Sequence, residues 1–325
     1  MDWQRQHWLV KGWNNLRVIT QIDNNTFKKH TGVGLGNFDG LHIGHMALIN
    51  TLISECKLND LQSVVYTFTK HPDTMLRKAL ISPIITTNEE KTKLLSSTAL
   101  DTLCYKEFDE AFSQLSPLEF VENILINTLK IRLAVVGFNY RFGFMGKGDV
   151  EYLKKCGEKY GFRVIVIPPV KVNSEVVSST LIREYIKKGK MERVFQLLGR
   201  HFSLYGTVIA GRHIGRTLGF PTANIMAHPK MVVPANGVYI TKTKYGDKWI
   251  SSITNVGIAP TLREGSAFSI ETHMLDYDED IYGKDIEVCF IHKLRDEKKN
   301  DSIEALKKQV NDDIKKAKEY WEVLK

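Results

Sequence analysis

The sequence contains few cysteines, and they lie far apart. Its 325 residues include four, at Cys56, Cys104, Cys156 and Cys289. No CxxC pair occurs, which argues against a zinc or redox site made of neighbouring cysteines. Isolated thiols are typical of the reducing cytosol, where disulfides are rare. We therefore expect a cytoplasmic protein whose cysteines are free.

Long apolar segments are also missing. The longest, such as residues 133–138, are far shorter than the ~20 residues that a membrane helix needs. Residues 1–12 contain charges instead of a basic segment followed by an apolar one, so they do not predict a secretory signal. The phosphate-binding pattern GxxxxGKS/T does not occur either. We expect a soluble protein that has no membrane partner and is not a P-loop enzyme.

The rest of the composition is ordinary, with one bias. Hydrophobic residues make up 43% and charged residues 25%, fractions that exclude a disordered or collagen-like chain. The length suggests about two domains. Lysine and arginine outnumber aspartate and glutamate by 45 to 37. This excess favours partners that carry phosphate, whether nucleotides, nucleic acid or a membrane surface, and does not choose among them.

The first half alternates strand-like and helix-like segments. Apolar strands are predicted at residues 31–35, 63–68, 103–108, 132–136 and 162–167. Helical patterns lie between them, at residues 44–57, 87–97, 116–129 and 149–160. Apolar strands that alternate with helices predict a parallel sheet covered on both faces.

The pattern changes near residue 200. Short strands are predicted at residues 204–209, 238–244, 249–256, 269–276 and 286–292, which favours a small antiparallel barrel or sandwich. A terminal helix should cover residues 301–325, with Asp301 as its N-cap. Helical residues 179–198, broken near Gly189, bridge the two halves. We place the domains at residues 1–185 and 186–325.

A glycine- and histidine-rich segment joins the first strand to the first helix. It reads Gly36, Asn37, Phe38, Asp39, Gly40, Leu41, His42, Ile43, Gly44, His45. A helix N-terminus binds anions, and glycines let the backbone approach a phosphate closely. His42 and His45 are three apart, so both can face a triphosphate. A dinucleotide fingerprint fits poorly, because Asp39 replaces its third glycine. The HxGH pattern resembles the nucleotidyltransferase superfamily, which includes class I aminoacyl-tRNA synthetases, but no KMSKS-like loop follows.

Other polar segments lie where strands end or helices begin, which is the ligand edge of an α/β sheet. They are His71 after the second strand, Asn139 and Arg141 after the 132–136 strand, and Ser179, Thr180 and Arg183 at the start of the bridging helix. Arginine offers forked donors to phosphate. Each segment alone is equally compatible with an ordinary surface loop.

The second half has a glycine-rich stretch suited to phosphates, which contains Gly211, Gly215, Arg216, Gly219 and Pro221. Thr222 and Asn224 follow, two residues apart, and their oxygen atoms suit Mg²⁺. Tight barrel turns would explain the same glycines. Glu271 lies within a predicted strand and is either a surface residue or the base of a phosphoryl transfer.

Together these motifs resemble the prokaryotic bifunctional riboflavin kinase/FMN adenylyltransferases, or FAD synthetases, over nearly the whole chain. The matching segments are GNFDGLHIGH, FNYRFG, SSTLIR, GRTLGFPTAN, NGVYI, ETHMLDY, YGKDIEV and LRDE, in that order. Departures occur at Asn139-Tyr140, where the family often has Asp-Phe, near Gly146, where an arginine is common, and at Asn255 and Asn300.

The resemblance implies a Rossmann-like nucleotidyltransferase domain followed by a riboflavin kinase barrel. The barrel would phosphorylate riboflavin to FMN with ATP, with Glu271 as base, Thr222 and Asn224 at Mg²⁺ and Arg295 near the flavin. The first domain would transfer AMP from a second ATP to FMN, which gives FAD and pyrophosphate. His42, His45, Asn139 and Arg183 would act there.

The resemblance also implies small-molecule partners and no nucleic acid. The sequence does not determine the oligomeric state, and we expect a monomer or weak oligomer. The other predicted nucleotide contacts are Gly36, Asn37, Phe38, Asp39, Gly40, Gly44, His71, Arg141, Ser179, Thr180, Gly211, Gly215, Arg216, Gly219 and Pro221. Three alternatives remain open: an adenylyltransferase with an inactive barrel, a flavin-binding regulator, and a related cytidylyl- or pantetheine-type transferase.

Overall fold

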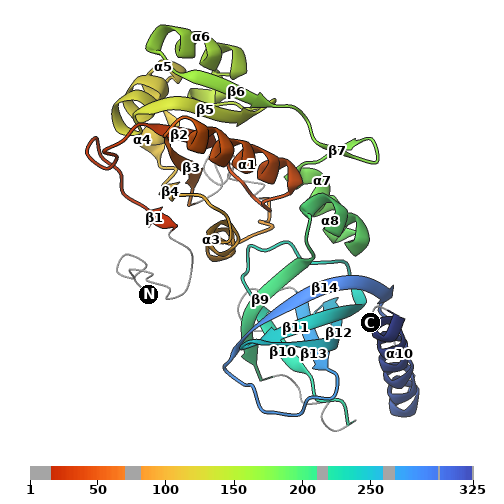
Figure 1. Ribbon diagram of the computed structural model, residues 1–325. Coiled ribbons are helices and arrows are strands. Elements are labelled where there is room, and N and C mark those ends of the chain that lie inside the picture. Colours follow the sequence, from red (N-terminus) through yellow and green to blue (C-terminus); the bar gives the residue numbers. More distant parts are fainter. Residues whose placement is uncertain (1–15, 70–81, 211–218, 259–267, 299–300, 324–325) are drawn as a thin grey trace. The chain divides into compact units, whose positions relative to one another are not determined.

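A computed structural model describes residues 16–69, 82–210, 219–258, 268–298 and 301–323. The chain divides into two compact units (Figure 1). The first contains Met1–Ser82 and Thr86–Val177, and the second contains Pro83–Ile85 and Ser178–Lys325. The expected boundary after residue 185 lies within helix α7 (Ser179–Lys187), which is part of the second unit.

The first unit is built on a six-stranded sheet in the order β1-β4-β3-β2-β5-β6. All of its strand pairs are parallel, as the sequence predicts. The strands are β1 (Arg17–Ile19), β2 (Thr31–Leu35), β3 (Gln62–Phe68), β4 (Thr102–Lys106), β5 (Ile131–Gly137) and β6 (Arg163–Ile167). Strand β1 was not predicted, because it is only three residues long and largely exposed.

Helices cover both faces of this parallel sheet, as the sequence predicts. On one face, α1 (Ile43–Leu58) and α3 (Asn88–Ser96) bury Leu52 and Leu95 against β3, β4 and β5. On the other, η1 (Phe120–Thr128), which follows the short α5 (Pro117–Glu119), and α6 (Val150–Tyr160) form a second core. Smaller elements are α4 (Glu110–Ser113), η2 (Phe144–Gly146), β7 (Lys171–Val172) and β8 (Glu175–Val176).

Local sequence signals determine where several helices begin. Capping boxes start α3 and α5, formed by Thr87 with Glu90 and by Ser116 with Glu119. The helix that follows Ser116 differs from the prediction in one respect, because η1 is a π-helix. The N–H of Leu129 donates to the carbonyl of Ile124, and the Thr128 hydroxyl donates to the carbonyl of Asn123. The backbone bond of Leu129 spans five residues, so the chain is wound more widely here than in an α-helix.

The order in which the chain adds strands to the sheet reverses between β2 and β5. From β2 the chain moves outward through β3 and β4 on one side, and β5 and β6 lie on the other. Loops that leave two such strands at their carboxyl ends separate and open a crevice, where ligands of α/β proteins bind. The HxGH turn follows β2 and the Asn139 loop follows β5. The topology therefore brings two of the predicted segments to the edge of the sheet where a ligand is expected.

The second unit is a closed antiparallel barrel in the order β10-β13-β12-β11-β14-β9. Its strands are β9 (Phe202–Ile209), β10 (Ala223–Ala227), β11 (Gly237–Tyr245), β12 (Lys248–Ile258), β13 (Phe268–Met274) and β14 (Asp285–Arg295). The sequence predicts five of them, and the pattern does not indicate β10 as a strand. Inside the barrel, the hydroxyls of Thr241, Thr254 and Thr272 form a buried chain with spacings of 2.8 Å.

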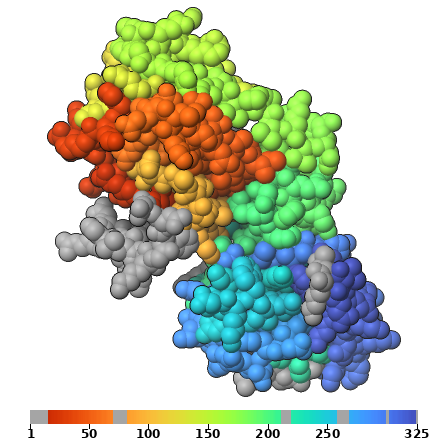
Figure 2. Space-filling model, in the orientation of Figure 1, coloured from red at the N-terminus to blue at the C-terminus, as the bar shows by residue number. Residues whose placement is uncertain are grey.

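Three helices belong to the barrel unit. α7 and α8 (Met191–Leu198) pack together and are separated near Gly189, as predicted. The terminal helix α10 (Ile303–Val323) buries Ala317 against Ile240 and Ile253. Its dark-blue atoms lie along one side of the barrel in Figure 2. The prediction of Asp301 as N-cap is wrong: the Ser302 hydroxyl accepts the N–H of Ala305 at 3.1 Å, and Ser302 starts the helix.

Candidate active sites in the two units

The turn after β2 has an unusual backbone. Phe38, Gly40 and Leu41 have φ angles of 52°, 83° and 40°. Positive φ is rare for bulky residues and persists only where the surroundings enforce it, often at functional sites. Here Phe38 and Leu41 are both 1% exposed, so their burial in the core stabilises the turn.

Side chains from two neighbouring elements hold this turn in place. Thr86, just before α3, donates its N–H to the Asp39 carboxylate at 3.2 Å and accepts the N–H of Gly40 at 3.0 Å. The carbonyl of Asn37 accepts hydrogen bonds from the Thr67 hydroxyl at 3.0 Å and from Lys91 Nζ at 2.9 Å. The turn is thus fastened from both β3 and α3.

The two histidines of the HxGH motif lie together at the start of α1. Their rings stack, with centroids 3.6 Å apart and planes inclined by 15°. Nδ1 of His42 accepts the N–H of His45 at 3.2 Å, so in the neutral ring the proton is on Nε2. A Cβ on Gly44 would lie 3.2 Å from the His42 ring, which explains why glycine separates the histidines. The motif therefore presents an imidazole N–H donor beside the helix N-terminus.

The loop after β5 carries the next predicted residues. Asn139 is exposed, and Arg141 forms a solvent-exposed ion pair with Asp149 at 3.7 Å. Asp149 also caps α6 by accepting the N–H of Tyr152. The loop closes on itself through paired backbone bonds between Phe142 and Gly148.

The remaining residues predicted for nucleotide binding in the first half lie elsewhere. His71 is outside the described residues. Ser179 and Thr180 form the first turn of α7, which Ser178 caps by accepting the N–H of Leu181. Arg183 donates from Nε to the carbonyl of Pro83 at 2.7 Å. These residues belong to the second compact unit, and their contact with a nucleotide stays a prediction.

The barrel brings Glu271 and Asn224 side by side. Asn224 on β10 and Asn255 on β12 are the direct antiparallel partners of Glu271 on β13, one on each side. Directly opposed residues share a face, with Cβ atoms about 5 Å apart. The three side chains therefore form a row on one face of the sheet. In β13 the buried residues alternate with Glu271, so this row faces away from the barrel core.

Neighbouring groups orient this row. The Ser269 hydroxyl donates to Oε1 of Glu271 at 3.0 Å. Nδ1 of His273 lies 2.8 Å from the carbonyl of Pro221 and so carries the proton that it donates there. This bond fixes the backbone just before Thr222. Thr222 and Asn224 are partly exposed and alternate with buried Ala223 and Ile225, so they share one face.

The glycine-rich stretch is only partly described. Gly211, Gly215 and Arg216 lie outside the described residues. Gly219 has a φ of 87°, a backbone that glycine adopts without strain, and Pro221 is exposed. Binding of phosphates by this stretch stays a prediction.

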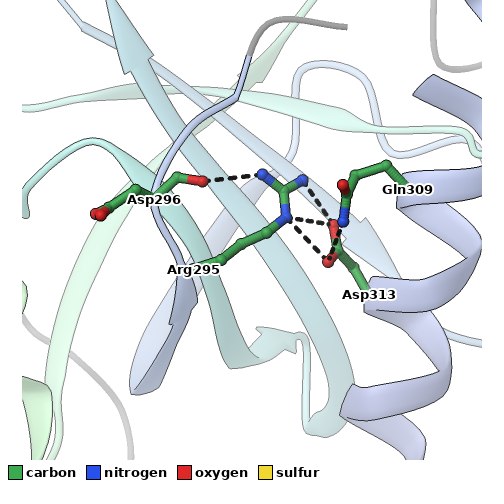
Figure 3. Close-up of polar contacts among 4 residues, drawn as sticks. All are labelled: Arg295, Asp296, Gln309 and Asp313. Atoms are coloured by element: carbon green, nitrogen blue, oxygen red, sulfur yellow. Dashed lines mark hydrogen bonds and ion pairs between the residues drawn. The ribbon is translucent and has the colours of Figure 1, made fainter. Parts of the chain in front are cut away.

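Arg295 is tied to the terminal helix (Figure 3). Its Nε and Nη2 atoms donate to the Asp313 carboxylate at 2.7–3.0 Å, and Nη1 donates to the carbonyl of Asp296 at 3.0 Å. Asp313 is 1% exposed and also accepts a bond from Gln309. Arg295 therefore anchors α10 to β14, whatever its relation to a flavin.

The sequence reasoning missed several residues of these sites. Lys91 stands in no motif, and His273 stands in the ETHMLDY segment without a role assigned to it, since each acts through a backbone carbonyl that is distant in sequence. Asn255 was noted only as a departure from the family, and its pairing with Glu271 depends on the strand register. Aromatic rings also gather where β3, β4 and β5 end; they are Phe68, Phe108, Phe112, Phe120, Tyr140 and Phe142.

Comparisons with known proteins agree with this division into two sites. The family model for FAD synthetase matches residues 24–181, and that for riboflavin kinase matches residues 198–321. A bifunctional riboflavin kinase/FMN adenylyltransferase of Buchnera aphidicola is 36% identical and covers 98% of this chain and 99% of its own. The Listeria monocytogenes protein of the same name is 34% identical over 90% of this chain and 93% of its own.

A crystal structure from Streptococcus pneumoniae, described as a macrolide-efflux protein, has the same fold. It is 28% identical, with a TM-score of 0.83 over 93% of this chain and 97% of its own. Among the described residues, no helix is both long and apolar enough to cross a membrane. The two family models and the relatives, which match over nearly their full length, identify the chain as a member of the bifunctional riboflavin kinase/FMN adenylyltransferase family.

Proposed function

We propose that the chain makes FMN from riboflavin in the barrel unit and FAD from FMN in the α/β unit, with ATP as the second substrate of both reactions. One observation carries the proposal: each matched family model lies almost entirely within one unit, and each unit has its own cluster of polar side chains. The stacked histidines follow β2, where the strand order of the sheet reverses, and Glu271 lies between two asparagines on the barrel. The alternative of an inactive barrel is not favoured, because Thr222, Asn224 and Glu271 are all present.

In adenylyl transfer, a phosphate oxygen of FMN attacks the α-phosphorus of ATP. The bond from that phosphorus to the bridging oxygen breaks, and pyrophosphate leaves. FMN phosphate is already a good nucleophile, so positioning and charge stabilisation supply most of the rate. His42 donates from Nε2 to the phosphates, and His45 stacks against it and fixes its ring. Asn139, which is exposed on the loop after β5, contacts nucleotide or phosphate, and the partly exposed rings of Phe68, Phe108 and Phe112 offer an apolar surface for a flavin ring.

In the kinase reaction, the 5′-hydroxyl of the ribityl chain attacks the γ-phosphorus of ATP, and ADP leaves. Glu271 accepts the hydroxyl proton. Ser269 donates to one oxygen of this carboxylate, which leaves the second oxygen available for the substrate. Asn255 and Asn224 flank the base on the two neighbouring strands.

The residues around Thr222 fit a magnesium ion. Mg²⁺ prefers oxygen ligands and keeps several waters and substrate phosphates in its shell. Thr222 and Asn224 present a hydroxyl and an amide oxygen on one face of the chain, beside the Glu271 carboxylate. When bound with ATP, the ion would neutralise charge on the phosphates. His273 contributes by holding Pro221 and thus the position of Thr222.

The cysteines are consistent with a reducing, cytoplasmic location, which is part of the proposal. All four cysteines are free thiols. Three of them are buried, namely Cys56, Cys104 and Cys156, and Cys289 is partly buried. Burial raises the pKa of Cys56 and Cys104 to about 12, so both thiols stay protonated and unreactive at neutral pH. We further propose that the partners are small molecules and not nucleic acid, and that the chain acts as a monomer or weak oligomer.

Incubation with riboflavin and Mg·ATP, followed by chromatography of the flavins, tests the proposal. FMN should appear first and FAD second. The double substitution His42→Ala and His45→Ala should stop FAD formation and leave FMN formation near the wild-type rate, because the kinase residues lie in the other unit. Equal loss of both activities in a folded variant would contradict separate sites, and absence of both products from the wild type would refute the function.

A further inference from the structure

A lysine is buried behind the turn that carries the HxGH motif. Lys91 on α3 is 4% exposed, and its Nζ donates to the carbonyl of Asn37 at 2.9 Å. On its other side the ammonium lies 5.8 Å from the centre of the Tyr105 ring. Lysine is rarely buried to this degree, because its charge must leave water.

The burial of this charge is unfavourable for folding. Desolvation lowers the pKa of Lys91 to about 8, and the attraction of Asp39 opposes this shift only in part. The hydrogen bond to Asn37 does not explain the lysine, because the Thr67 hydroxyl already donates to the same carbonyl. With a neutral side chain at position 91, the Asn37 carbonyl would therefore still be hydrogen-bonded. A charge kept at a cost to stability points to a functional use.

Asp39 identifies that use. Its carboxylate is 5% exposed and is fastened to the turn by the N–H of Thr86. A carboxylate at this position repels the phosphates of ATP, which the same turn and the start of α1 would bind. The Lys91 charge, which Asp39 attracts, offsets the repulsion, and in a poorly solvated site that effect is strong.

We propose, building on the proposed adenylyl transfer, that Lys91 is a positioning residue of that site. Its ammonium neutralises Asp39 and holds the Asn37 carbonyl, so that the turn keeps the backbone in which it binds the ATP phosphates. Lys91 does not touch the substrate and acts through the turn.

The variant Lys91→Met separates this role from a structural one. Methionine has a similar length and no charge. We expect kcat/KM for ATP in adenylyl transfer to fall about 10-fold or more, since small misplacements of bound groups carry penalties of this size. The melting temperature of the α/β unit should stay equal or rise, because the costly buried charge is gone. The FMN-forming rate should not change. The control Lys57→Met removes an exposed charge from α1 and should leave both rates unchanged.

The pH profile of the wild type provides a test that needs no variant. Lys91 loses its proton as the pH rises through about 8, so kcat/KM for ATP should fall between pH 7 and pH 9. The same fall should be absent from Lys91→Met. The groups that face Lys91 are Asp39 on the turn and Tyr105 on β4, and Glu90 precedes it on α3; burial raises the pKa of Tyr105 far above this range.

The results separate a failure of the proposed adenylyl transfer from a failure of the proposed role of Lys91. If the wild type makes no FAD, the adenylyl transfer itself is wrong. If the wild type makes FAD and Lys91→Met is as fast, or loses activity only in proportion to its folded fraction, Lys91 has no positioning role. A matching pH profile in both proteins would overturn it as well.

Discussion

Glu271 is the residue on which the kinase assignment depends most. The sequence shows a glutamate within a strand, a pattern equally typical of a solvated surface. The structure adds its neighbours: an asparagine on each side and a serine hydroxyl on Oε1. A carboxylate that accepts a hydrogen bond from Ser269 and lies between two asparagines on one sheet face is better suited to a defined task than to general solubility.

We predict that Glu271→Gln slows FMN formation by about 10²-fold or more, a typical contribution of a general base. The amide oxygen of glutamine can still accept the bond from Ser269, so the fold and ATP binding should persist. Steady-state rates of both half-reactions, measured in one preparation, check this. FAD formation from supplied FMN serves as the internal control. An undiminished kinase rate would leave Glu271 without a catalytic role.

At the level of single residues, the sequence predicts those that stand in motifs and not those that act across the fold. His42 and His45 are three apart on one helix, so their proximity follows from helix geometry. Asn255 reaches Glu271 only through the register of β12 with β13. Lys91 reaches Asn37 only because α3 packs beside the turn after β2. Contacts of this kind depend on the tertiary fold, which local patterns do not encode.

At the level of elements, predictions succeed where local chemistry dominates. The capping boxes of Thr87 and Ser116 set helix starts that the structure reproduces. β10 was not assigned as a strand because it is short and follows a glycine-rich stretch, and barrel closure, a non-local constraint, makes it a strand. At the start of α10, both Asp301 and Ser302 are acceptable caps, and the pattern alone does not choose between them.

The anchor of α10 leads to a second prediction. Asp313 and Arg295 form a forked ion pair in which Asp313 is 1% exposed (Figure 3). Asp313→Ala leaves the Arg295 charge half-buried without its partner, so it should destabilise the barrel unit by about 2–4 kcal/mol. The amides of α10 should then exchange hydrogen faster than in the wild type.

The neighbouring Asp312 is exposed and provides a matched control, because Asp312→Ala should change stability by no more than ~0.5 kcal/mol. Replacing both partners, as Arg295→Met with Asp313→Leu, should recover much of the loss, since no uncompensated charge remains. Calorimetry and hydrogen exchange on the three variants check this. If Asp313→Ala is as stable as Asp312→Ala, the ion pair does not anchor the helix.

At the level of the whole molecule, two units in one chain suggest that each reaction has its own scaffold. The change from alternating strands and helices to short spaced strands predicts the division. The residue at which the units divide is harder to predict, because the sequence pattern of a helix does not show which hydrophobic core the helix packs against. α7 looks continuous with the first half, yet its buried residues Ile182 and Ile186 belong to the unit that contains the barrel. No local sequence pattern indicates that Pro83–Ile85 belongs to that unit.

The last prediction concerns the barrel unit alone. We expect residues 178–325 to fold and to convert riboflavin to FMN, with no FAD. The fragment lacks Pro83–Ile85, so it loses the backbone bonds of Ile84 to Lys230 and Val232 and the burial of Ile85. Its melting temperature should therefore lie about 2–8 °C below that of the same unit in the full chain.

A shorter fragment, residues 186–325, offers the matched comparison. It cuts α7 and removes Ile182, which is 0% exposed, so it should melt lower still or aggregate. Equal stability of the two fragments would place the boundary at residue 185 instead of 177. A folded 178–325 fragment that makes no FMN would mean that the kinase reaction depends on the first unit. Calorimetry and flavin chromatography on both fragments therefore decide the boundary and the independence of the barrel together.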